Sequence, residues 1–163
     1  MTAATRESVY DVLSTVLDPE VPVLDVVSLG IVRDVVISDE GRAVEVVITP
    51  TYSGCPAMRT IEANIANALR DHGWPDATIR TVLSPAWTTD WMTDAARERL
   101  REYGIAPPEH SSAAPCGSDP KAVTCPQCGS TNTRLLSLFG STACKAMHVC
   151  NDCLEPFEQF KCI

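Results

Sequence analysis

Apolar residues recur at the spacing of a helix in three segments of the chain. The first helix is predicted to end before Pro19, since proline disfavours helical geometry in the preceding residue, and its apolar stripe is Val9, Leu13, Val16 and Leu17. The second is predicted to run from Pro56 to Gly73, with an apolar face of Ala57, Met58, Ile61, Ile65, Ala68 and Leu69. The third follows Pro85 and ends at Gly104.

Alternating apolar and polar residues predict strands between these helices. Residues 31–38 and 43–49 flank a short polar turn, which is the pattern of a β-hairpin. Residues 77–83 alternate in the same way and predict a third strand. The fold class is therefore α+β, and residues 1–103 are predicted to form a small α/β module in the order helix, β-hairpin, helix, strand, helix.

The chain changes character after this module. Residues 104–123 are rich in Pro, Ser, Ala and Gly and show no periodicity, which is typical of a linker. Residues 124–163 then predict a second, small domain, in which two short strands turn near Gly140 and Ser141.

Four cysteines of this second domain form two C-x-x-C pairs. Cys125 and Cys128 make the first pair, and Cys150 and Cys153 make the second. Two facing turns of this kind offer a tetrahedron of thiolates, which suits Zn²⁺ in a structural site. Residues 124–163 are therefore predicted to be a zinc-ribbon, in which the four cysteines leave no open position for a substrate.

The metal is expected to be the main stabiliser of so small a domain, with an apparent contribution on the order of 10 kcal/mol. Iron accepts the same thiolates, so the choice between zinc and iron stays open at this point. Gly129 favours the turn after the first pair, whereas Leu154 follows the second pair, where glycine is usual.

Three further cysteines and a histidine lie in or near the ribbon. Cys144 and Cys162 are either small buried apolar residues or a second set of thiols that handles iron or sulfide. Cys116 falls in the predicted linker. His148 is interpreted as a surface residue of a strand rather than a ligand.

Charge and composition narrow the range of partners and compartments. The formal net charge is −8, and all the acidic surplus precedes Ser112, so nucleic acid is not an expected partner. The sequence shows no secretory signal and no run of about 18 apolar residues, so we expect a soluble, cytoplasmic protein without membrane contact. In that compartment, eight cysteines indicate metal or thiol chemistry rather than structural disulfides.

Cys55 is the lone cysteine of the first module. It stands at the predicted start of the second helix, where backbone N–H groups and the helix dipole are expected to lower its pKa. Cys55 is therefore a candidate nucleophile or ligand of iron or a cluster; the alternative is a buried capping cysteine. The other candidate site residues are three acidic residues, whose alternative role is to form turns, and a hydroxyl beside Cys55, namely Asp18, Glu20, Asp25 and Thr51.

A cysteine hydrolase would need a histidine base near Cys55. The sequence offers His72, at the far end of the same helix, and His110 in the linker. A helix of about 15 residues is roughly 22 Å long, so His72 is not expected to reach Cys55 and no catalytic residue is predicted. A single thiolate cannot hold a cluster alone, so further ligands would come from a client, a small thiol or the second copy of a homodimer.

Two segments of the first module, DPEVPVLDVVSLGIVRDV and TPTYSGCPAM, resemble the iron–sulfur cluster assembly family that includes SufT and the cytosolic assembly factors of eukaryotes. The resemblance covers residues 1 to about 103. It implies that the family's recurring cysteine falls on Cys55, and its acidic motif on Asp18 and Glu20. The continuation LSPAWTTDWMTDAARERL, the ribbon and the segments FGSTACKA and EPFEQFKC resemble the PaaD family of accessory subunits of the phenylacetyl-CoA epoxidase system.

The epoxidase system contains a di-iron oxygenase and a reductase with a [2Fe–2S] cluster. The resemblance implies that this chain helps to mature one of these metal centres in aerobic phenylacetate breakdown and is not itself an enzyme. The expected partners are the oxygenase or reductase subunits, and the expected cofactors are structural zinc and a transient iron–sulfur cluster or iron. The alternative is a structural or regulatory subunit that transfers no metal.

Overall fold

The computed structural model describes residues 3–109 and 123–163. The chain divides into two compact units, Met1–Trp87 and Thr88–Ile163. The boundary expected from the sequence lies later, at residue 103, because the third helix reads as a continuation of the first module. In the structure that helix belongs to the second unit.

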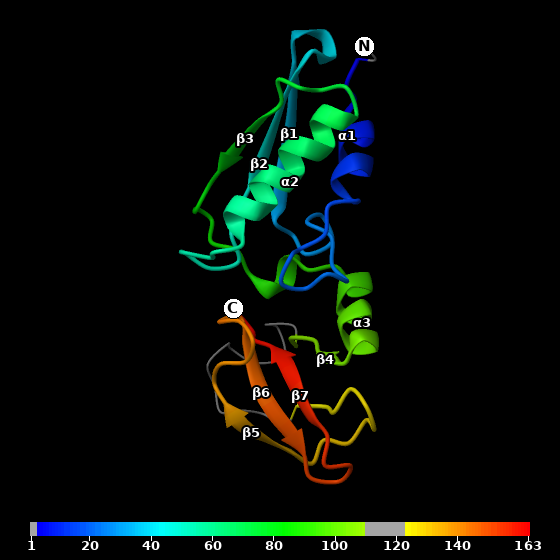
Figure 1. Ribbon diagram of the computed structural model, residues 1–163, viewed down its shortest axis with the longest axis vertical. Coiled ribbons are helices and arrows are strands. Elements are labelled where there is room, and N and C mark those ends of the chain that lie inside the picture. Colours follow the sequence, from blue (N-terminus) through cyan, green and yellow to red (C-terminus); the bar gives the residue numbers. More distant parts are fainter. Residues whose placement is uncertain (1–2, 110–122) are drawn as a thin grey trace. The chain divides into compact units, whose positions relative to one another are not determined.

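The first unit is a three-stranded sheet with two helices packed on one face (Figure 1). The strands lie in the order β1-β2-β3, with β1 and β2 antiparallel and β2 and β3 parallel. Residues from the helices and the sheet share one core, for example Leu13, Val46 and Ile65. The elements are α1 (Arg6–Leu13), β1 (Val32–Ser38), β2 (Ala43–Ile48), α2 (Met58–Asp71) and β3 (Thr78–Thr81).

Two helix ends differ from the sequence prediction. Helix α1 ends at Leu13, and Leu17 instead forms an isolated bridge with Asp25. The loop between α1 and β1 is apolar and buried, with Val21 and Leu24 at 2% and 0% exposure, so its apolar residues enter the core without forming a helix. Helix α2 begins at Met58, because the residues before it form turns.

The second unit contains the short helix α3 and a four-stranded sheet (Figure 1). Helix α3 is capped by the side chain of Thr93 and ends at Gly104, whose φ of 93° is left-handed. The strand order is β4-β7-β6-β5, with β4 parallel to β7 and the other pairs antiparallel. The elements are α3 (Asp94–Tyr103), β4 (Ile105–Ala106), β5 (Thr133–Ser137), β6 (Lys145–Cys150) and β7 (Pro156–Phe160).

Strands β4 and β7 are additions to the two ribbon strands that the sequence predicts. Strand β4 lies within the segment expected to be a linker. The buried guanidinium of Arg97 holds the chain after β4 by donating to the backbone oxygens of Pro108 and Thr89. The remainder of the predicted linker, residues 110–122, lies outside the described residues.

The α+β class, with an α/β module and a β-ribbon, is confirmed. None of the described helices combines the length and apolar character needed to cross a bilayer.

Candidate metal centre and the Cys55 loop

The structure brings the four predicted ribbon cysteines together. All four sulfur atoms lie within 4.8 Å of one another. The Sγ atoms of Cys125 and Cys153 are 3.8 Å apart, and those of Cys128 and Cys150 are 3.5 Å apart. A tetrahedron with Zn–S bonds of about 2.3 Å has edges of about 3.8 Å, so the four thiols fit a tetrahedral metal ion.

Hydrogen bonds fix the turns that carry these thiols. In the first turn, the N–H of Gly129 donates to the carbonyl of Cys125 at 3.0 Å. The turns are also tied to each other, because the carboxylate of Asp152 accepts from the amide of Asn132 at 2.8 Å and from the hydroxyl of Ser130. These contacts preorganise the thiols for a shared ion.

One thiol of the set is also prepared electrostatically. The backbone N–H of Cys153, joined by that of Asp152, lowers the pKa of the Cys150 thiol to about 7. Burial and the neighbouring thiols raise the pKa of Cys153 to about 12, so Cys150 is the thiol suited to begin coordination and Cys153 would lose its proton to the metal.

The second turn ends at Leu154, whose backbone is in the left-handed region. Leu154 has a φ of 64°, close to the 76° of Gly129 at the equivalent position. Its side chain is 74% exposed. The turn geometry that glycine normally supplies is therefore reached by a leucine held in the left-handed region.

The other ribbon residues do not join the metal centre. Cys144 is a buried cysteine whose sulfur lies 3.0 Å from the hydroxyl of Thr142. Cys162 takes part in a disulfide bond, so the expectation that the cysteines form no structural disulfide is wrong for this residue. Cys116 lies outside the described residues. The expectation that His148 is a surface residue is wrong: it is 3% exposed and stacks on Phe157 with ring centroids 5.7 Å apart.

Cys55 lies in the loop formed by residues 49–57, the Cys55 loop, which joins β2 to α2. Its own N–H donates to the carbonyl of Tyr52 at 3.3 Å, which closes a tight turn through Gly54. Gly54 has a φ of 85° and no atom within 4 Å of where a Cβ would stand, so the turn has open space on that side. The Cys55 side chain is half-buried. Thr51 is buried in the same loop.

The pKa of the Cys55 thiol is raised, so the expectation of a lowered pKa is wrong. Partial burial raises it most, while the N–H of Ala57 and the side chain of Tyr52 lower it. The negative charges of Glu20 and, more weakly, Asp18 raise it further. The helix effect is limited because α2 begins only at Met58.

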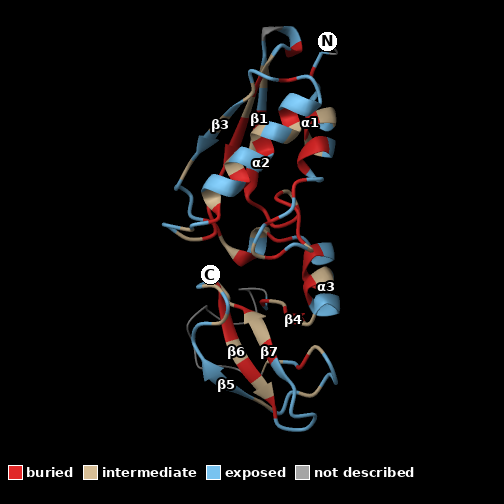
Figure 2. Ribbon diagram, in the orientation of Figure 1, coloured by how far each residue is buried: buried red, intermediate tan, exposed pale blue. Residues whose placement is uncertain are grey.

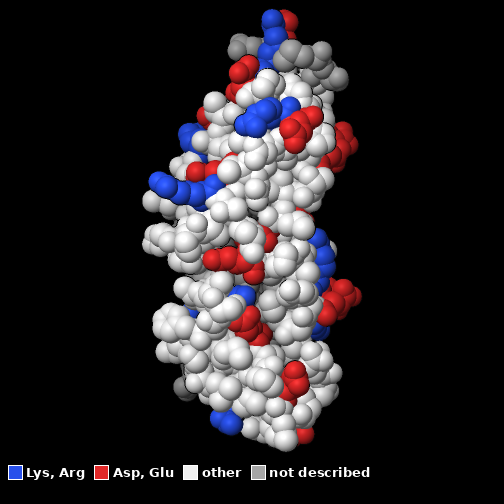
Figure 3. All heavy atoms as spheres, in the orientation of Figure 1, with Lys and Arg blue, Asp and Glu red and all other residues white. Residues whose placement is uncertain are grey.

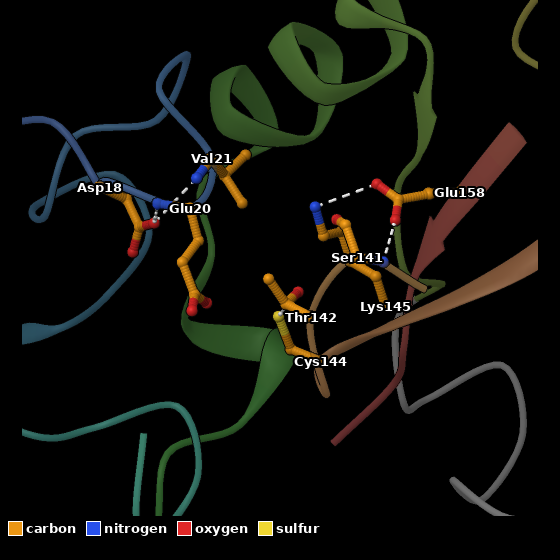
Figure 4. Close-up of polar contacts among 8 residues, drawn as sticks. All are labelled: Asp18, Glu20, Val21, Ser141, Thr142, Cys144, Lys145 and Glu158. Carbon is orange, nitrogen blue, oxygen red and sulfur yellow. Dashed lines mark hydrogen bonds and ion pairs between the residues drawn. The ribbon is translucent and has the colours of Figure 1, made fainter. Parts of the chain in front are cut away.

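The carboxylates of the predicted acidic residues have two roles: some accept hydrogen bonds within turns, and some raise the pKa of Cys55. The Asp18 carboxylate accepts from the N–H groups of Glu20 and Val21 at 2.7 and 2.9 Å (Figure 4). The buried Asp25 carboxylate accepts from the N–H and hydroxyl of Ser28 at 2.8 and 2.6 Å. Both residues therefore hold turns, while the charges of Asp18 and Glu20 also act on Cys55.

Among the described residues, Cys55 belongs to no group of side chains that could share an ion, and His72 lies at the far end of α2. In this part of the chain, the four ribbon cysteines are the one group of three or more Cys, His, Asp or Glu side chains close enough to share an ion. His72 is the C-cap of α2, and its ring nitrogen Nδ1 lies 2.8 Å from the carbonyl of Ala68. The helix between His72 and the Cys55 loop is about 21 Å long, which separates the two side chains.

The sequence does not predict one ion pair of the ribbon, between Lys145 and Glu158. The ammonium of Lys145 on β6 lies 3.0 Å from the carboxylate of Glu158 on β7, and the two side chains are 4% and 20% exposed (Figure 4). Glu158 also accepts from the N–H of Ser141 at the β5–β6 turn. The pairing depends on the register of β7, which was not predicted.

Two family models match the chain. The iron–sulfur cluster assembly protein model matches residues 6–81, and the PaaD zinc beta ribbon domain model matches residues 109–161. A crystal structure of a domain of unknown function, DUF59, from Bacillus anthracis is 27% identical, covers 58% of this chain and 90% of its own, and has a TM-score of 0.54. A conserved hypothetical protein from Thermotoga maritima is 32% identical over 61% of this chain and 98% of its own, with a TM-score of 0.52.

The sequence relatives follow the same division. An Escherichia coli protein named as a subunit of 1,2-phenylacetyl-CoA epoxidase is 50% identical over 95% of this chain and 92% of its own length. The Fe-S protein maturation auxiliary factor YitW of Bacillus subtilis is 35% identical over 61% of this chain and 97% of its own. SufT of Staphylococcus aureus, also named a maturation auxiliary factor, is 36% identical over 52% and 96%. Both predicted resemblances are confirmed.

Proposed function

We propose a maturation role for this chain, which belongs to the PaaD family of phenylacetyl-CoA epoxidase subunits. In this role the chain catalyses no oxygenation. It engages iron or an iron–sulfur cluster through Cys55 and passes it to a metalloprotein of the epoxidase complex during aerobic phenylacetate breakdown. The proposed clients are the oxygenase and the [2Fe–2S] reductase, and the proposed compartment is the cytoplasm.

The observation that carries this proposal is the position of Cys55. It lies in the domain that matches the iron–sulfur cluster assembly family, half-buried in a turn with open space beside Gly54. The charges of Glu20 and Asp18 act on its sulfur. A cation at this thiol would be attracted by the same charges, and iron is a cation that thiolates bind well. One chain supplies one thiolate here, so the client, a small thiol or a second copy would complete the coordination.

In this role the ribbon is a structural domain, and its own metal is not transferred. Cys125, Cys128, Cys150 and Cys153 would hold Zn²⁺, which supplies a rigid cross-link between the two turns and no open coordination position. We assign zinc rather than iron because the family model that matches residues 109–161 describes a zinc beta ribbon, and a structural site of four thiolates needs no redox-active metal. Metal analysis of the purified protein tests this assignment.

Anaerobic reconstitution tests the role of Cys55. Parent protein and Cys55→Ser, both loaded with zinc, are incubated with ferrous iron and sulfide and then mixed with apo-oxygenase or apo-reductase. We expect Cys55→Ser to lose most of the iron bound beyond the zinc site and to fail in activating the client. Cys144→Ser removes a cysteine that belongs neither to the Cys55 loop nor to the four-cysteine group and is expected to behave as the parent. Equal iron binding and equal activation by Cys55→Ser would reject the ligand role.

A second candidate function is a structural or regulatory subunit that transfers no metal. It is favoured by the description of the Escherichia coli relative as a subunit. It predicts stoichiometric co-purification with the oxygenase and normal iron content in the other subunits when this chain is deleted. The maturation role predicts iron-deficient subunits in the same deletion.

A further inference from the structure

We propose that the ribbon docks an acidic, apolar segment of the client protein on an exposed surface formed by β5, the turn after it and the residue that follows β7. This surface, the β5 surface, consists of four apolar residues and two cations, namely Leu135, Leu136, Leu138, Phe139, Arg134 and Lys161. The inference rests on the proposed function, because it assigns the place where the client of that function binds.

The apolar residues of the β5 surface are exposed, both in the strand and in the turn that follows its end at Ser137. Leu136, Leu138 and Phe139 are 49%, 62% and 65% exposed. Strand β5 is drawn largely as exposed in Figure 2, whereas β6 beside it is largely buried. Contiguous exposed apolar side chains on a folded domain mark interaction sites, because leaving them in water forgoes the free energy of burial. Strand β5 is also an edge of the sheet among the described strands.

The charge beside these apolar residues is positive. Residues 133–139 contain Arg134 and no acidic residue. The ammonium of Lys161 donates to the carbonyl of Leu138 at 3.0 Å and lies 4.6 Å from the ring centroid of Phe139. A positive charge is thus fixed against the apolar turn. Over the region of β5 to β7, the face drawn in Figure 3 is mostly uncharged.

The positive charges of Arg134 and Lys161 indicate which kind of segment binds to the β5 surface. A second copy pairing β5 with β5 would bring two positive, acid-free segments together, which costs free energy. The register shift between Leu135 and Ser137 also interrupts the regular edge that strand pairing between copies needs. An acidic segment with apolar anchors complements both the cations and the exposed side chains, so the occupant is a segment of another protein.

Binding of purified epoxidase subunits to the zinc-loaded full chain tests the proposal. The oxygenase and the reductase are titrated separately, and Kd is measured at low and high salt. We expect Leu138→Ser/Phe139→Ser to weaken binding of the client subunit by about tenfold or more, since truncated apolar anchors dominate interface energetics. We expect Arg134→Glu/Lys161→Glu to weaken binding by a similar factor and to abolish or reverse its decrease with salt.

Matched controls come from the first unit. Leu83→Ser removes a leucine that is 64% exposed, and Arg59→Glu reverses an exposed charge on α2, so both are expected to bind as the parent does. The proposal is overturned if the parent binds neither subunit, or if the β5 variants bind as tightly as these controls. Self-association of the parent that Leu138→Ser/Phe139→Ser abolishes would identify a second copy as the occupant and would also overturn it.

The outcome can be separated from that of the proposed function. Cys55→Ser is expected to bind the client subunit with the affinity of the parent while failing in reconstitution. Normal reconstitution by Cys55→Ser, together with weak binding by the β5 variants, would reject metal transfer through Cys55 and leave the docking surface in place.

Discussion

At the scale of single residues, the surroundings of Cys55 favour the protonated form of its thiol when no cation is bound. Burial and the carboxylates of Glu20 and Asp18 raise its pKa, although the N–H of Ala57 and the side chain of Tyr52 oppose the rise. The thiol is therefore mostly protonated at neutral pH, and a bound cation would have to displace the proton. Protonation protects the sulfur from nonspecific oxidation and alkylation before a metal binds, because the thiolate is the reactive form.

Glu20→Gln tests this electrostatic effect. Removing the charge of Glu20 lowers the pKa of Cys55, so a larger fraction is thiolate at pH 8 and alkylation by iodoacetamide becomes faster. Mass spectrometry of the peptide that contains Cys55 measures the rate. Glu62→Gln, on α2, removes an equal charge that is not among the main causes of the Cys55 pKa shift and should leave the rate unchanged. An unchanged or slower rate in Glu20→Gln would contradict the assignment.

The left-handed residues that end the two metal-binding turns give a second test at this scale. Leu154→Gly should stabilise the zinc-loaded protein by about 1 kcal/mol, because an L-residue pays roughly that much for left-handed geometry. Gly129→Ala should destabilise by about the same amount, since space is open around Gly129 and only the backbone is strained. Urea unfolding at fixed zinc concentration measures both. Destabilisation by Leu154→Gly would show that the exposed leucine makes contacts that outweigh the strain.

At the scale of elements, the sequence predicts those whose residues alternate or recur regularly. The hairpin of β1 and β2 and the helices α2 and α3 follow from such patterns, and the cysteine spacing predicts the ribbon. Strand β7 could not be predicted, because Pro156–Phe160 is a short segment whose strand state depends on pairing with β6. The raised pKa of Cys55 could not be predicted for a similar reason: it depends first on how far the folded chain buries the thiol, and then on the charges of Glu20 and Asp18 in the loop before β1.

A largely buried ion pair links β6 and β7. Lys145→Met should destabilise the zinc-loaded protein by about 2–3 kcal/mol, because it removes the counter-charge of a Glu158 carboxylate that is largely out of water and keeps only its hydrogen bond from Ser141. Lys145→Met/Glu158→Leu is the control, and it should recover much of the loss because no charge remains buried. Urea unfolding at neutral pH measures both variants. Equal loss in the single and double variants would show that packing, and not the unpaired charge, sets the cost.

At the scale of the whole molecule, different interactions stabilise each of the two units. The first has a core formed by two helices and a sheet, with residues such as Val9, Ile48 and Leu69 fully buried. The apolar cluster of the ribbon is small and includes two of the proposed metal ligands, Cys125 and Cys150, with Ala106 and Phe157. The metal would therefore stabilise both the turns and the core of the ribbon, whereas the first unit has no comparable dependence.

Metal removal should accordingly unfold one unit and leave the other intact. On addition of a strong zinc chelator, amide hydrogen exchange in β5, β6 and β7 should approach the rate of an unfolded chain, because binding free energy on the order of 10 kcal/mol is lost from a domain whose apolar cluster includes two of the ligands. Amides of β1, β2 and α2 should remain protected, since their core contains no ligand of the metal. Cys128→Ser should reproduce this pattern without chelator, and Cys55→Ser should not. Loss of protection in both units at once would show that they fold as one, and continued protection of β5 to β7 without metal would show that packing alone maintains the ribbon.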